Sequence, residues 1–469
     1  MSDPSTRSGL GLRETPIPGL LVITLDVRGD NRGWFKENWQ RRKMVDLGLP
    51  DFGPVQHNMS FNSRSGATRG IHAEPWDKLV SLAKGRIFGA WVDLRPGSTF
   101  GRCFTLELGP DTAVFVPRGV GNAFQTLEDE TVYSYLVNDH WNPAAKDSYT
   151  FVNLADETLA ITWPIPLTEA ELSAADQTHP RLDAVLPMPA KPMLIIGRNG
   201  QLGRALITEW PEATAVGRET LDLGSLESVA AFDFSPYGVV INAAAYTKVD
   251  LAETAAGRRE AWAVNVSGVA ALAAAADERR FTLVQISSDY VFDGTAETHD
   301  EREALSPLGV YGQTKAAGDV LVATAPAHYI VRTSWVIGDG PNFVRTMAAL
   351  ADRGVRPGVV ADQIGRLTFT GELVRAIRHL LDSNAAYGTY NVSNAGAAMS
   401  WAEIARTVFE ARGKDPSAVT ELSTAEYRDG KSLAPRPQHS VLSLSKIIDA
   451  GFQPAEALPQ LAGYLAALG

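Results

Sequence analysis

The sequence contains one cysteine, Cys103, in 469 residues, so no disulfide can form within the chain. A fold without disulfides has to be held by its apolar core, and the simplest compartment for it is a reducing cytoplasm. Uninterrupted apolar runs of about 18 residues, which a membrane-spanning helix needs, are absent. Residues 1–18 also lack the apolar core of a signal peptide. We therefore expect a cytoplasmic protein without a membrane partner.

Positive charge is also scarce. The chain has 43 lysines and arginines against 54 aspartates and glutamates, which leaves a formal net charge of −11. Proteins that bind the phosphate backbone of nucleic acids present a basic surface, so this balance argues against a nucleic-acid partner. Small acidic substrates can still be held by individual arginines and lysines.

The composition is that of a globular protein, with 45% hydrophobic and 21% charged residues. The length is too great for one core and indicates two or three domains. Three prolines between residues 187 and 192 prevent a helix or a central strand from continuing through this stretch. We therefore predict domains at residues 1–186 and 193–469, joined by a proline-rich linker at 187–192.

The first domain is predicted to be all-β. Residues 19–163 form short segments rich in Val, Phe, Trp and Thr, broken by turn signals at 28–33, 95–98 and 117–121. Many short strands at this spacing indicate a sandwich or a closed barrel. A helical pattern with a capped start returns only in short pieces, such as residues 168–175.

Several strings in about the first 180 residues follow the order of one known family. This part resembles the dTDP-4-dehydrorhamnose 3,5-epimerases, which are jelly-roll cupins. The matching strings lie at residues 32–37, 55–60, 68–72, 78–80, 92–95, 99–101, 161–164 and 171–176.

The resemblance implies a set of site residues. His72 would be the general base, oriented by Asp176, and Tyr135 would be the acid on the opposite face of the sugar. Lys78 would lie near the enolate oxygen. The remaining residues implied for the substrate are Arg69 at the sugar and diphosphate, Gln56 and Asn58 in the pocket lining, and Arg32 and Glu37, which typically reach the nucleotide from the neighbouring subunit of a homodimer.

These residue types suit the chemistry. The hydrogens at C3 and C5 of a 4-keto sugar are acidic because the enolate spreads onto the C4 oxygen, and a neutral imidazole is a natural base near pH 7. Two positions depart from the family: Gly89 stands where an aspartate is usual, and Asn122 where a histidine is usual. They leave open single or double epimerisation, or a binding module without turnover. His57, His140 and His179 have no comparable neighbours in the sequence, and no spacing predicts a metal site.

The second domain opens with a dinucleotide-binding pattern. Apolar residues 193–196 predict a buried strand, the glycines at 197, 200 and 203 a tight turn, and residues 201–210 a helix facing a pyrophosphate. Strands predicted at 239–242, 282–286 and 329–331 then alternate with helices predicted at 260–276 and 311–323. This alternation indicates a parallel, doubly wound Rossmann-type sheet, followed by a small substrate-binding part.

Polar residues follow these strands at the expected edge of the sheet. Ser288 ends one strand, and Tyr311 and Lys315 lie one helical turn apart, on the same helix face. The combination resembles the active site of the extended short-chain dehydrogenases. More narrowly, residues 193–469 resemble the dTDP-4-dehydrorhamnose reductases, in strings at 200–203, 242–250, 288–292, 332–335, 362–365 and 436–437.

By that resemblance Tyr311 would protonate the C4 alkoxide and Ser288 would hydrogen-bond to it. Lys315 would lower the phenol pKa toward working pH and hold the ribose. No acidic residue occurs at 215–218, and Arg218 favours a 2′-phosphate, so NADPH is the expected cofactor, with NADH as the alternative. Some relatives hold Mg²⁺ at a dimer interface, but its ligands are not identifiable here. The cofactor residues are Gly197, Asn199, Gly200, Gln201, Leu202, Arg218, Asp222, Leu223, Ala243, Ala244, Ala245, Asn265, Tyr311 and Lys315, and Trp335 and Arg366 line the substrate side.

The main hypothesis is a bifunctional enzyme. It would epimerise dTDP-4-dehydro-6-deoxyglucose and reduce the product to dTDP-L-rhamnose, as a homodimer through the cupin domain. A second hypothesis keeps the reductase and makes the cupin a binding or dimerisation module. A third makes the second domain a non-catalytic regulatory subunit, which the complete set of Ser288, Tyr311 and Lys315 disfavours.

Overall fold

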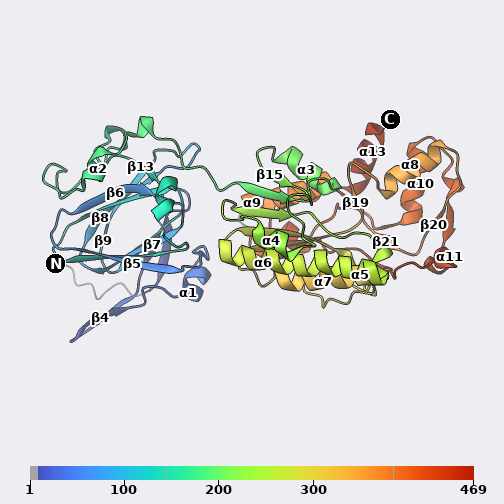
Figure 1. Ribbon diagram of the computed structural model, residues 1–469, viewed down its shortest axis with the longest axis horizontal. Coiled ribbons are helices and arrows are strands. Elements are labelled where there is room, and N and C mark those ends of the chain that lie inside the picture. The colour runs from blue at the N-terminus through green and yellow to red at the C-terminus, as the bar shows by residue number, and fades with distance from the viewer. Residues whose placement is uncertain (1–8, 142, 384, 469) are drawn as a thin grey trace. The chain divides into compact units, whose positions relative to one another are not determined.

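The computed structural model describes residues 9–141, 143–383 and 385–468, and the chain divides into two compact units, Met1–Ala190 and Lys191–Gly469 (Figure 1). The first eight residues of the predicted N-terminal domain therefore lie outside the described part. Within that part, no helix combines the length and the apolar character that crossing a membrane requires.

The first unit is built from two antiparallel sheets, which confirms the prediction of many short strands. One sheet has the order β1(Gly11–Glu14), β2(Leu21–Thr24), β10(Thr112–Val116), β7(Lys78–Lys84), β12(Thr131–Val137), β5(Gln56–Asn62). The other has the order β13(Thr150–Phe151), β6(Thr68–Ala73), β11(Val120–Thr126), β8(Ile87–Asp93), β9(Cys103–Leu108). Val80 and Val114 from the first sheet pack with Trp91 and Phe124 from the second, so one apolar core joins the sheets.

Short elements surround these sheets. A separate hairpin, β3(Val27–Asp30) and β4(Gly33–Lys36), projects from the sheets (Figure 1). The helices of the unit are all short: α1(Arg41–Asp46), α2(Ala174–Thr178), and the 3-10 turns η2(Pro143–Ser148), η3(Glu157–Leu159) and η4(Leu182–Ala184).

The helical pattern predicted at residues 168–175 was wrong for most of its length. Glu171 forms a β-bridge with Ala67, and α2 begins only at Ala174. The helix starts there because the Ser173 hydroxyl accepts a hydrogen bond of 3.1 Å from the Asp176 backbone N–H. The serine, and not the earlier threonine, is the N-cap.

The second unit contains a six-stranded parallel sheet that confirms all the strands predicted for it. Its order is β15(Thr214–Val216), β14(Met193–Ile196), β16(Val239–Asn242), β17(Thr282–Ser288), β18(His328–Thr333), β23(Gly388–Asn391). Strand order reverses between β14 and β16, and ligands of open parallel sheets bind beyond the carboxyl ends of the strands at such a point.

Helices cover both faces of this sheet. Leu194 of β14 packs into a core with α6, and its neighbour Ile195 packs on the opposite side with α9. Figure 1 shows α6 and α7 along one face and α3 and α9 along the other. The helices are α3(Gln201–Glu209), α4(Leu226–Ala231), α5(Ala255–Trp262), α6(Gly268–Arg279), α7(Val310–Val322), α9(Thr370–Asp382) and α12(Ser445–Asp449). A π-helical segment, Ala263–Ser267, joins α5 to α6, and 3-10 turns lie at Leu251–Glu253 and Asp289–Val291.

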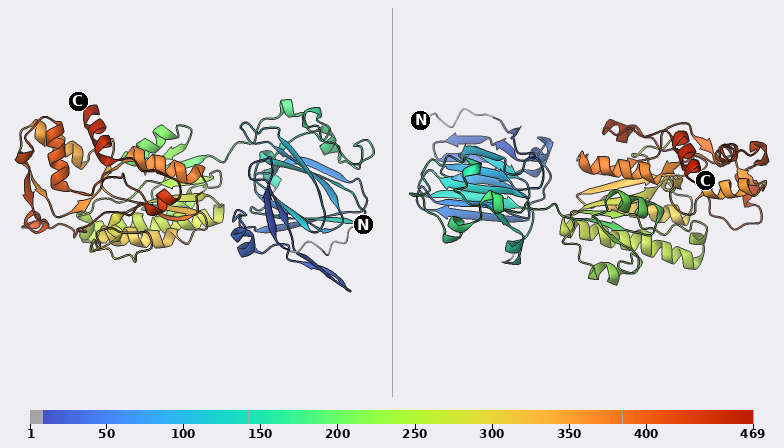
Figure 2. Two further views of the ribbon diagram at one scale, coloured as in Figure 1. Left: turned by 180° about the vertical axis from the view of Figure 1, so that it is seen from behind. Right: turned by 90° about the horizontal axis from the view of Figure 1, so that it is seen from above.

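A smaller part at the C-terminal end has its own core, in which Val344, Ile404 and Leu461 meet. Figure 2 shows it, in orange and red, beside the parallel sheet. It contains α8(Phe343–Asp352), α10(Trp401–Ala411), α11(Thr424–Arg428), α13(Ala457–Ala467) and a 3-10 turn at Pro416–Ala418. Its strands pair as β19(Val336–Ile337) with β22(Thr368–Phe369), β20(Gly358–Val360) with β25(Thr420–Leu422), and β21(Ile364–Gly365) with β24(Met399–Ser400).

The proline-rich stretch is bound at both of its ends. Met188 is buried in the core of the first unit, and Arg118 Nη1 donates a hydrogen bond of 2.6 Å to the Pro189 carbonyl. In the second unit, the Gly238 N–H donates to the Pro192 carbonyl at 2.9 Å. Most of the segment interpreted as a tether is therefore packed against one unit or the other.

Candidate active sites

A cavity of about 430 Å³ in the first unit brings together five residues implied by the epimerase resemblance. Both sheets contribute, and the N-terminal turn of α2 closes one side. The five residues are Arg69, His72, Lys78, Tyr135 and Asp176.

His72 and Asp176 form a hydrogen-bonded pair. His72 Nε2 lies 2.7 Å from Asp176 Oδ1, and the aspartate side chain is only 6% exposed. Burial opposes ionisation, but the hydrogen bond and the charge of His72 outweigh it and hold the pKa of Asp176 below its ordinary value. An ionised Asp176 places the imidazole proton on Nε2, so Nδ1 keeps its lone pair and can act as a base.

Lys78 and Tyr135 lie together in the same cavity. Lys78 Nζ is 2.6 Å from Glu74 Oε1 and 5.5 Å from the centroid of the Tyr135 ring. Burial, helped by the Glu74 carboxylate, raises the pKa of Tyr135, so the phenol keeps its proton at neutral pH and can donate it. Sequence analysis missed Glu74, although its position four residues before Lys78 was a usable signal.

The two departures from the family lie in different surroundings. Asn122 lines the cavity and donates a hydrogen bond of 3.0 Å to the hydroxyl of Tyr133. Gly89 does not line it, because the Trp91 ring occupies the neighbouring space: a Cβ at Gly89 would lie 2.4 Å from Trp91 Cη2. An aspartate therefore cannot be accommodated at position 89 without moving the tryptophan.

Four residues implied for the substrate do not line this cavity. Gln56 Nε2 donates a hydrogen bond of 2.9 Å to Asn58 Oδ1, so these two side chains on β5 bind each other. Arg32, in the turn of the projecting hairpin, pairs with Asp30, and Glu37, just after it, pairs with Lys43. Arg32 and Glu37 are exposed, as residues that act on a neighbouring subunit would be.

The sequence analysis gave His179 no functional neighbours, but the structure places it beside His72 and Asp176. Its Nε2 lies 3.3 Å from Asp176 Oδ1, and its ring stacks on Phe151 with centroids 4.6 Å apart. Three residues along a helical turn bring it to the same side as Asp176. Among the described residues, His72, Asp176 and His179 are the one group of His, Cys, Asp or Glu close enough to hold a metal ion. No spacing in the sequence predicted this group, because His72 is more than 100 residues away from the other two.

A larger cavity, of about 900 Å³, lies in the second unit beyond the carboxyl ends of β14 and β16. This is the place that the reversal of strand order indicates, and the volume suits a large ligand such as a dinucleotide. Fifteen predicted residues line it: Gly197, Asn199, Gly200, Gln201, Leu202, Arg218, Asp222, Leu223, Ala243, Ala244, Ala245, Ser288, Tyr311, Lys315 and Trp335.

Close backbone packing explains the glycines at this cavity. Gly197 has φ +94°, and a Cβ there would lie 2.8 Å from the Ala244 nitrogen. A Cβ at Gly203 would lie 2.1 Å from the Gly197 carbonyl oxygen, so α3 can start directly against the turn. The free N–H groups at the start of α3 therefore lie beside the cavity, where an anion would be stabilised.

Arg218 lies at the far end of this cavity, just after β15. Its Nε donates a hydrogen bond of 3.0 Å to Asp222 Oδ2, and the side chain is otherwise well exposed. A second ion pair joins Arg198 of the glycine turn to Glu219, the residue after Arg218, at 2.6 Å. Both arginines are therefore paired with carboxylates, Arg218 with Asp222 and Arg198 with Glu219.

The three residues expected to be catalytic, Ser288, Tyr311 and Lys315, lie at the end of β17 and in the first turns of α7. The Ser288 hydroxyl accepts a hydrogen bond of 3.2 Å from the Tyr290 N–H, and Lys315 Nζ donates one of 2.7 Å to the Ile286 carbonyl. Burial lowers the pKa of Lys315 to about 8, against the opposing charge of Asp319.

The pKa of Tyr311 differs from expectation. Burial raises it to about 12, Ser288 opposes the change by a hydrogen bond, and the nearby carboxylates of Asp289 and Asp319 add to it. The prediction that Lys315 brings this pKa down toward working pH was wrong for the protein without cofactor. The physical reason is that burial destabilises the phenolate by more than the hydrogen bond from Ser288 stabilises it. A phenol with this pKa remains protonated and serves as an acid.

Two predicted residues lie outside this cavity. Asn265 is buried in the π-helical segment, where its side chain bonds both backbone groups of Tyr246 and the Thr314 hydroxyl. It supports the cavity wall through Tyr246. Arg366 donates to the Gly396 and Leu442 carbonyls, so its guanidinium joins segments of the C-terminal part.

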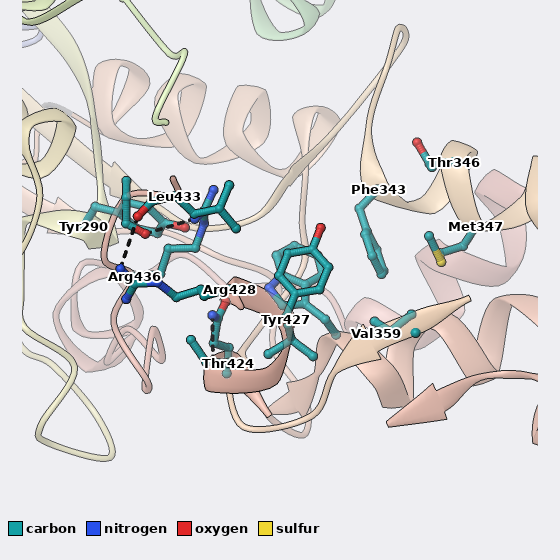
Figure 3. Close-up of a pocket in the computed structure, with 15 residues that line it drawn as sticks. Tyr290, Phe343, Thr346, Met347, Val359, Thr424, Tyr427, Arg428, Leu433 and Arg436 are labelled. Carbon is teal, nitrogen blue, oxygen red and sulfur yellow. Dashed lines mark hydrogen bonds between the residues drawn. The ribbon is translucent and has the colours of Figure 1, made fainter. Parts of the chain in front are cut away.

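A further cavity of about 340 Å³ adjoins the dinucleotide cavity and shares Tyr290 and Trp401 with it. Figure 3 shows Tyr427 and Arg428 of α11 and Arg436 among its labelled lining residues. Aromatic rings and guanidinium groups suit a base and a diphosphate. The sequence analysis did not identify this cavity, although three of the strings that resemble the reductases contribute Tyr290, Gln363 and Arg436 to its lining.

Trp335 connects the catalytic trio to this side of the unit. It has φ +44°, an uncommon value for a side chain of this size, and its ring stacks on Trp401 at 3.6 Å. Both rings line the dinucleotide cavity. The uncommon backbone conformation of Trp335 thus occurs at the wall of the cavity, where backbone strain is often found in functional sites.

Comparisons with known proteins assign each unit to the family that its sequence resembles. A family model described as dTDP-4-dehydrorhamnose 3,5-epimerase matches residues 14–184, and one described as RmlD substrate binding domain matches residues 191–468. An RmlC homolog of Streptococcus pyogenes is 52% identical over 180 residues, which cover 37% of this chain and 90% of that protein. A dTDP-4-dehydrorhamnose reductase of Mycolicibacterium smegmatis is 39% identical over 293 residues, covering 60% of this chain and 85% of that protein.

A solved structure resembles the second unit. It is the dTDP-4-dehydrorhamnose reductase of Bacillus anthracis in complex with NADP, which is 34% identical, with a TM-score of 0.54. The match covers 60% of this chain and 99% of that one.

Proposed function

Because the chain belongs to the dTDP-4-dehydrorhamnose 3,5-epimerase family over residues 14–184 and to the RmlD substrate binding domain family, that of the reductases, over residues 191–468, we propose how its two sites act in sequence. The chain is a bifunctional enzyme of dTDP-L-rhamnose biosynthesis. It epimerises dTDP-4-dehydro-6-deoxyglucose and reduces the 4-keto group of the product. The observation that carries this proposal is the presence of both sets of catalytic side chains, each gathered in its own cavity.

In the first cavity, His72 Nδ1 removes the proton at C3 or C5. Asp176 keeps the imidazole in the required tautomer and stabilises the imidazolium that forms. Tyr135 returns a proton on the opposite face, which inverts the centre. Lys78, already neutralised by Glu74, is the cation nearest to the developing enolate charge, and we assign it to the C4 oxygen.

In the second cavity, the residues that would hold NADPH are the glycine turn, the start of α3 and Arg218. NADPH supplies the hydride that reduces C4. Tyr311 gives its proton to the resulting sugar alkoxide, and Ser288 orients the same oxygen. Lys315 supplies positive charge beneath the phenol and is placed to bind the ribose hydroxyls. We prefer NADPH to NADH because Arg218 lines this cavity and could pair with a 2′-phosphate, which only NADPH has, and because the related reductase was solved in complex with NADP. No Mg²⁺ site is proposed.

The finer architecture and the oligomer also belong to this proposal. We assign the first unit to the jelly-roll cupins and the second to the doubly wound Rossmann-type folds. We propose a homodimer through the cupin, because β5 is an edge strand whose outward side chains Met59 and Phe61 are 64% and 62% exposed. Phe35, on the projecting hairpin, is 68% exposed. The single cysteine is consistent with work in a reducing cytoplasm.

A second candidate function keeps the reductase and makes the cupin a binding or dimerisation module. The observations that favour it are the closed space at Gly89 and the amide of Asn122 in the cavity. Against this second function, proton transfer by His72 and Tyr135 does not require a particular side chain at position 89 or 122.

Incubation of the whole chain with dTDP-4-dehydro-6-deoxyglucose in heavy water, first without and then with NADPH, tests the proposal. We expect deuterium at both C3 and C5 without any nicotinamide, and consumption of the ketone once NADPH is added. Deuterium at C3 alone would limit the first site to one epimerisation. No deuterium at either position, with reduction of the epimerised ketone intact, would favour the binding-module function.

A further inference from the structure

The first cavity contains more ligand atoms than epimerisation requires. His72 Nε2 lies 2.7 Å and His179 Nε2 lies 3.3 Å from the same Oδ1 of Asp176. All three atoms are within 4.8 Å of one another. Two imidazoles from separate elements, β6 and the end of α2, therefore converge on one carboxylate oxygen.

The ring of His179 is held in place without its nitrogen being satisfied. It stacks on Phe151 and meets the His72 ring edge to face at 5.5 Å, yet its buried Nε2 makes no hydrogen bond of good geometry. Two imidazole nitrogens and one carboxylate oxygen therefore face one another, and the nitrogen of His179 lacks a hydrogen-bond partner. This arrangement leaves a place that a cation would fill.

We propose that His72, Asp176 and His179 bind a divalent cation of the zinc class, and that this ion switches off epimerisation. Two imidazoles and a carboxylate are a ligand set that zinc accepts, with further positions left for water. Zinc to nitrogen bonds of about 2.0 Å in a tetrahedral site place neighbouring ligand atoms about 3.3 Å apart. The observed 2.7 and 3.3 Å require only a small adjustment of the His72 ring.

The switch follows from the position of one proton. Without metal, His72 carries its proton on Nε2, bonded to Asp176, and Nδ1 has a free lone pair. A cation bound to Nε2 takes that position, so the proton of the neutral ring moves to Nδ1. No proton is gained or lost by the ring, but the atom that would remove the C3 or C5 proton is no longer a base. Metal binding itself is independent of the proposed function, whereas the loss of activity depends on His72 being the base.

Direct binding measurements test the site. Calorimetric titration of the untagged full chain with zinc chloride should show tight binding that His179→Phe weakens at least about 100-fold, since removal of a ligand costs more than the 10- to 100-fold typical of its supporting residues. Phenylalanine retains the stacking on Phe151. His140→Phe is the matched control, because His140 is exposed and away from this cluster, and it should bind zinc as the parent does. His179→Gln replaces the phenylalanine variant if that does not fold.

Activity measurements test the switch. Deuterium exchange into the sugar should fall with zinc occupancy and return with a chelator, each variant being compared with its own metal-free rate. Reduction of an already epimerised ketone by the same molecules should not change. Equal zinc affinity in His179→Phe and the parent would overturn the site, and full exchange at saturating zinc would overturn the switch. Absence of exchange in metal-free protein would instead refute the proposed epimerase, while the titration still decides the site.

Discussion

The Ser288 hydroxyl donates a hydrogen bond of 2.8 Å to the buried carboxylate of Asp289. Burial raises the pKa of Tyr311 and Ser288 opposes that rise through a hydrogen bond, so the serine hydroxyl has two acceptors within reach, the Asp289 carboxylate and the Tyr311 oxygen. In this arrangement the phenol is the group that has a proton to give to the substrate. We therefore assign the proton transfer to Tyr311, and its variant is the first to test.

Tyr311→Phe should lower the rate of NADPH oxidation with an epimerised ketone by about 100- to 10,000-fold, the usual worth of a positioned general acid. The ring still packs, so we expect little change in NADPH affinity. Steady-state kinetics and fluorescence titration with NADPH measure the two quantities. Deuterium exchange at C3 and C5 is the internal control, and its loss in this variant would show that the two sites are not separate.

His72→Ala should have the opposite pattern. Deuterium uptake at C3 and C5 should become undetectable because His72 is the base in our assignment, and reduction of a supplied epimerised ketone should proceed at the parent rate. Nuclear magnetic resonance of the sugar reads the first result and NADPH absorbance the second. Residual exchange above one tenth of the parent rate would assign the base elsewhere.

Arg218→Ala should weaken NADPH more than NADH. A charge-assisted hydrogen bond to the 2′-phosphate contributes about 1.5 to 3 kcal/mol, which corresponds to roughly a 10- to 150-fold change in Kd for NADPH alone. Arg198→Ala, in the neighbouring glycine turn, is the comparison variant. Equal losses for both nucleotides would remove the basis for the NADPH preference.

Asp289→Asn should change how stability depends on pH. Burial raises the pKa of Asp289 from 3.8 to about 6, so the protonated form is favoured by folding. Its contribution to stability is fully present below pH 3.8 and is lost as pH rises through about 6. Relative to the asparagine variant, which does not titrate, the parent should lose up to about 3 kcal/mol over that interval.

Thermal unfolding of the second unit, identified by its upward shift with NADP⁺, provides the measurement for this pair. The difference between parent and variant should grow toward neutral pH and then level off. A difference that is constant from about pH 4 to pH 8 would mean that Asp289 does not change its protonation on folding.

The parts of the fold that repeat a periodic pattern could be predicted from sequence. The strands at 193–196 and 239–242 are continuous apolar runs, and each was located correctly because a buried parallel strand needs such a run. Ser288, Tyr311 and Lys315 could be expected to lie together because they follow strand and helix ends that have characteristic neighbours, and they do line one cavity. In these segments the residues close in sequence determine the structure, so the sequence alone is enough to predict it.

Contacts between distant segments could not be predicted in the same way. The pairing of His179 with Asp176 is local, but its approach to His72 depends on β6 meeting α2 across 104 residues of chain. The hydrogen bonds of Arg366 to two carbonyls depend likewise on loops that come together only in the folded unit. Burial of Tyr311, which reversed the expected direction of its pKa, is also a property of packing.

The contact of Gly89 with Trp91 has a consequence for engineering the first unit. Any side chain at position 89 would meet the buried indole, so an aspartate there requires the ring to move. An aspartate introduced alone should therefore destabilise this unit. Replacing the tryptophan by a smaller residue at the same time should make room for the new side chain.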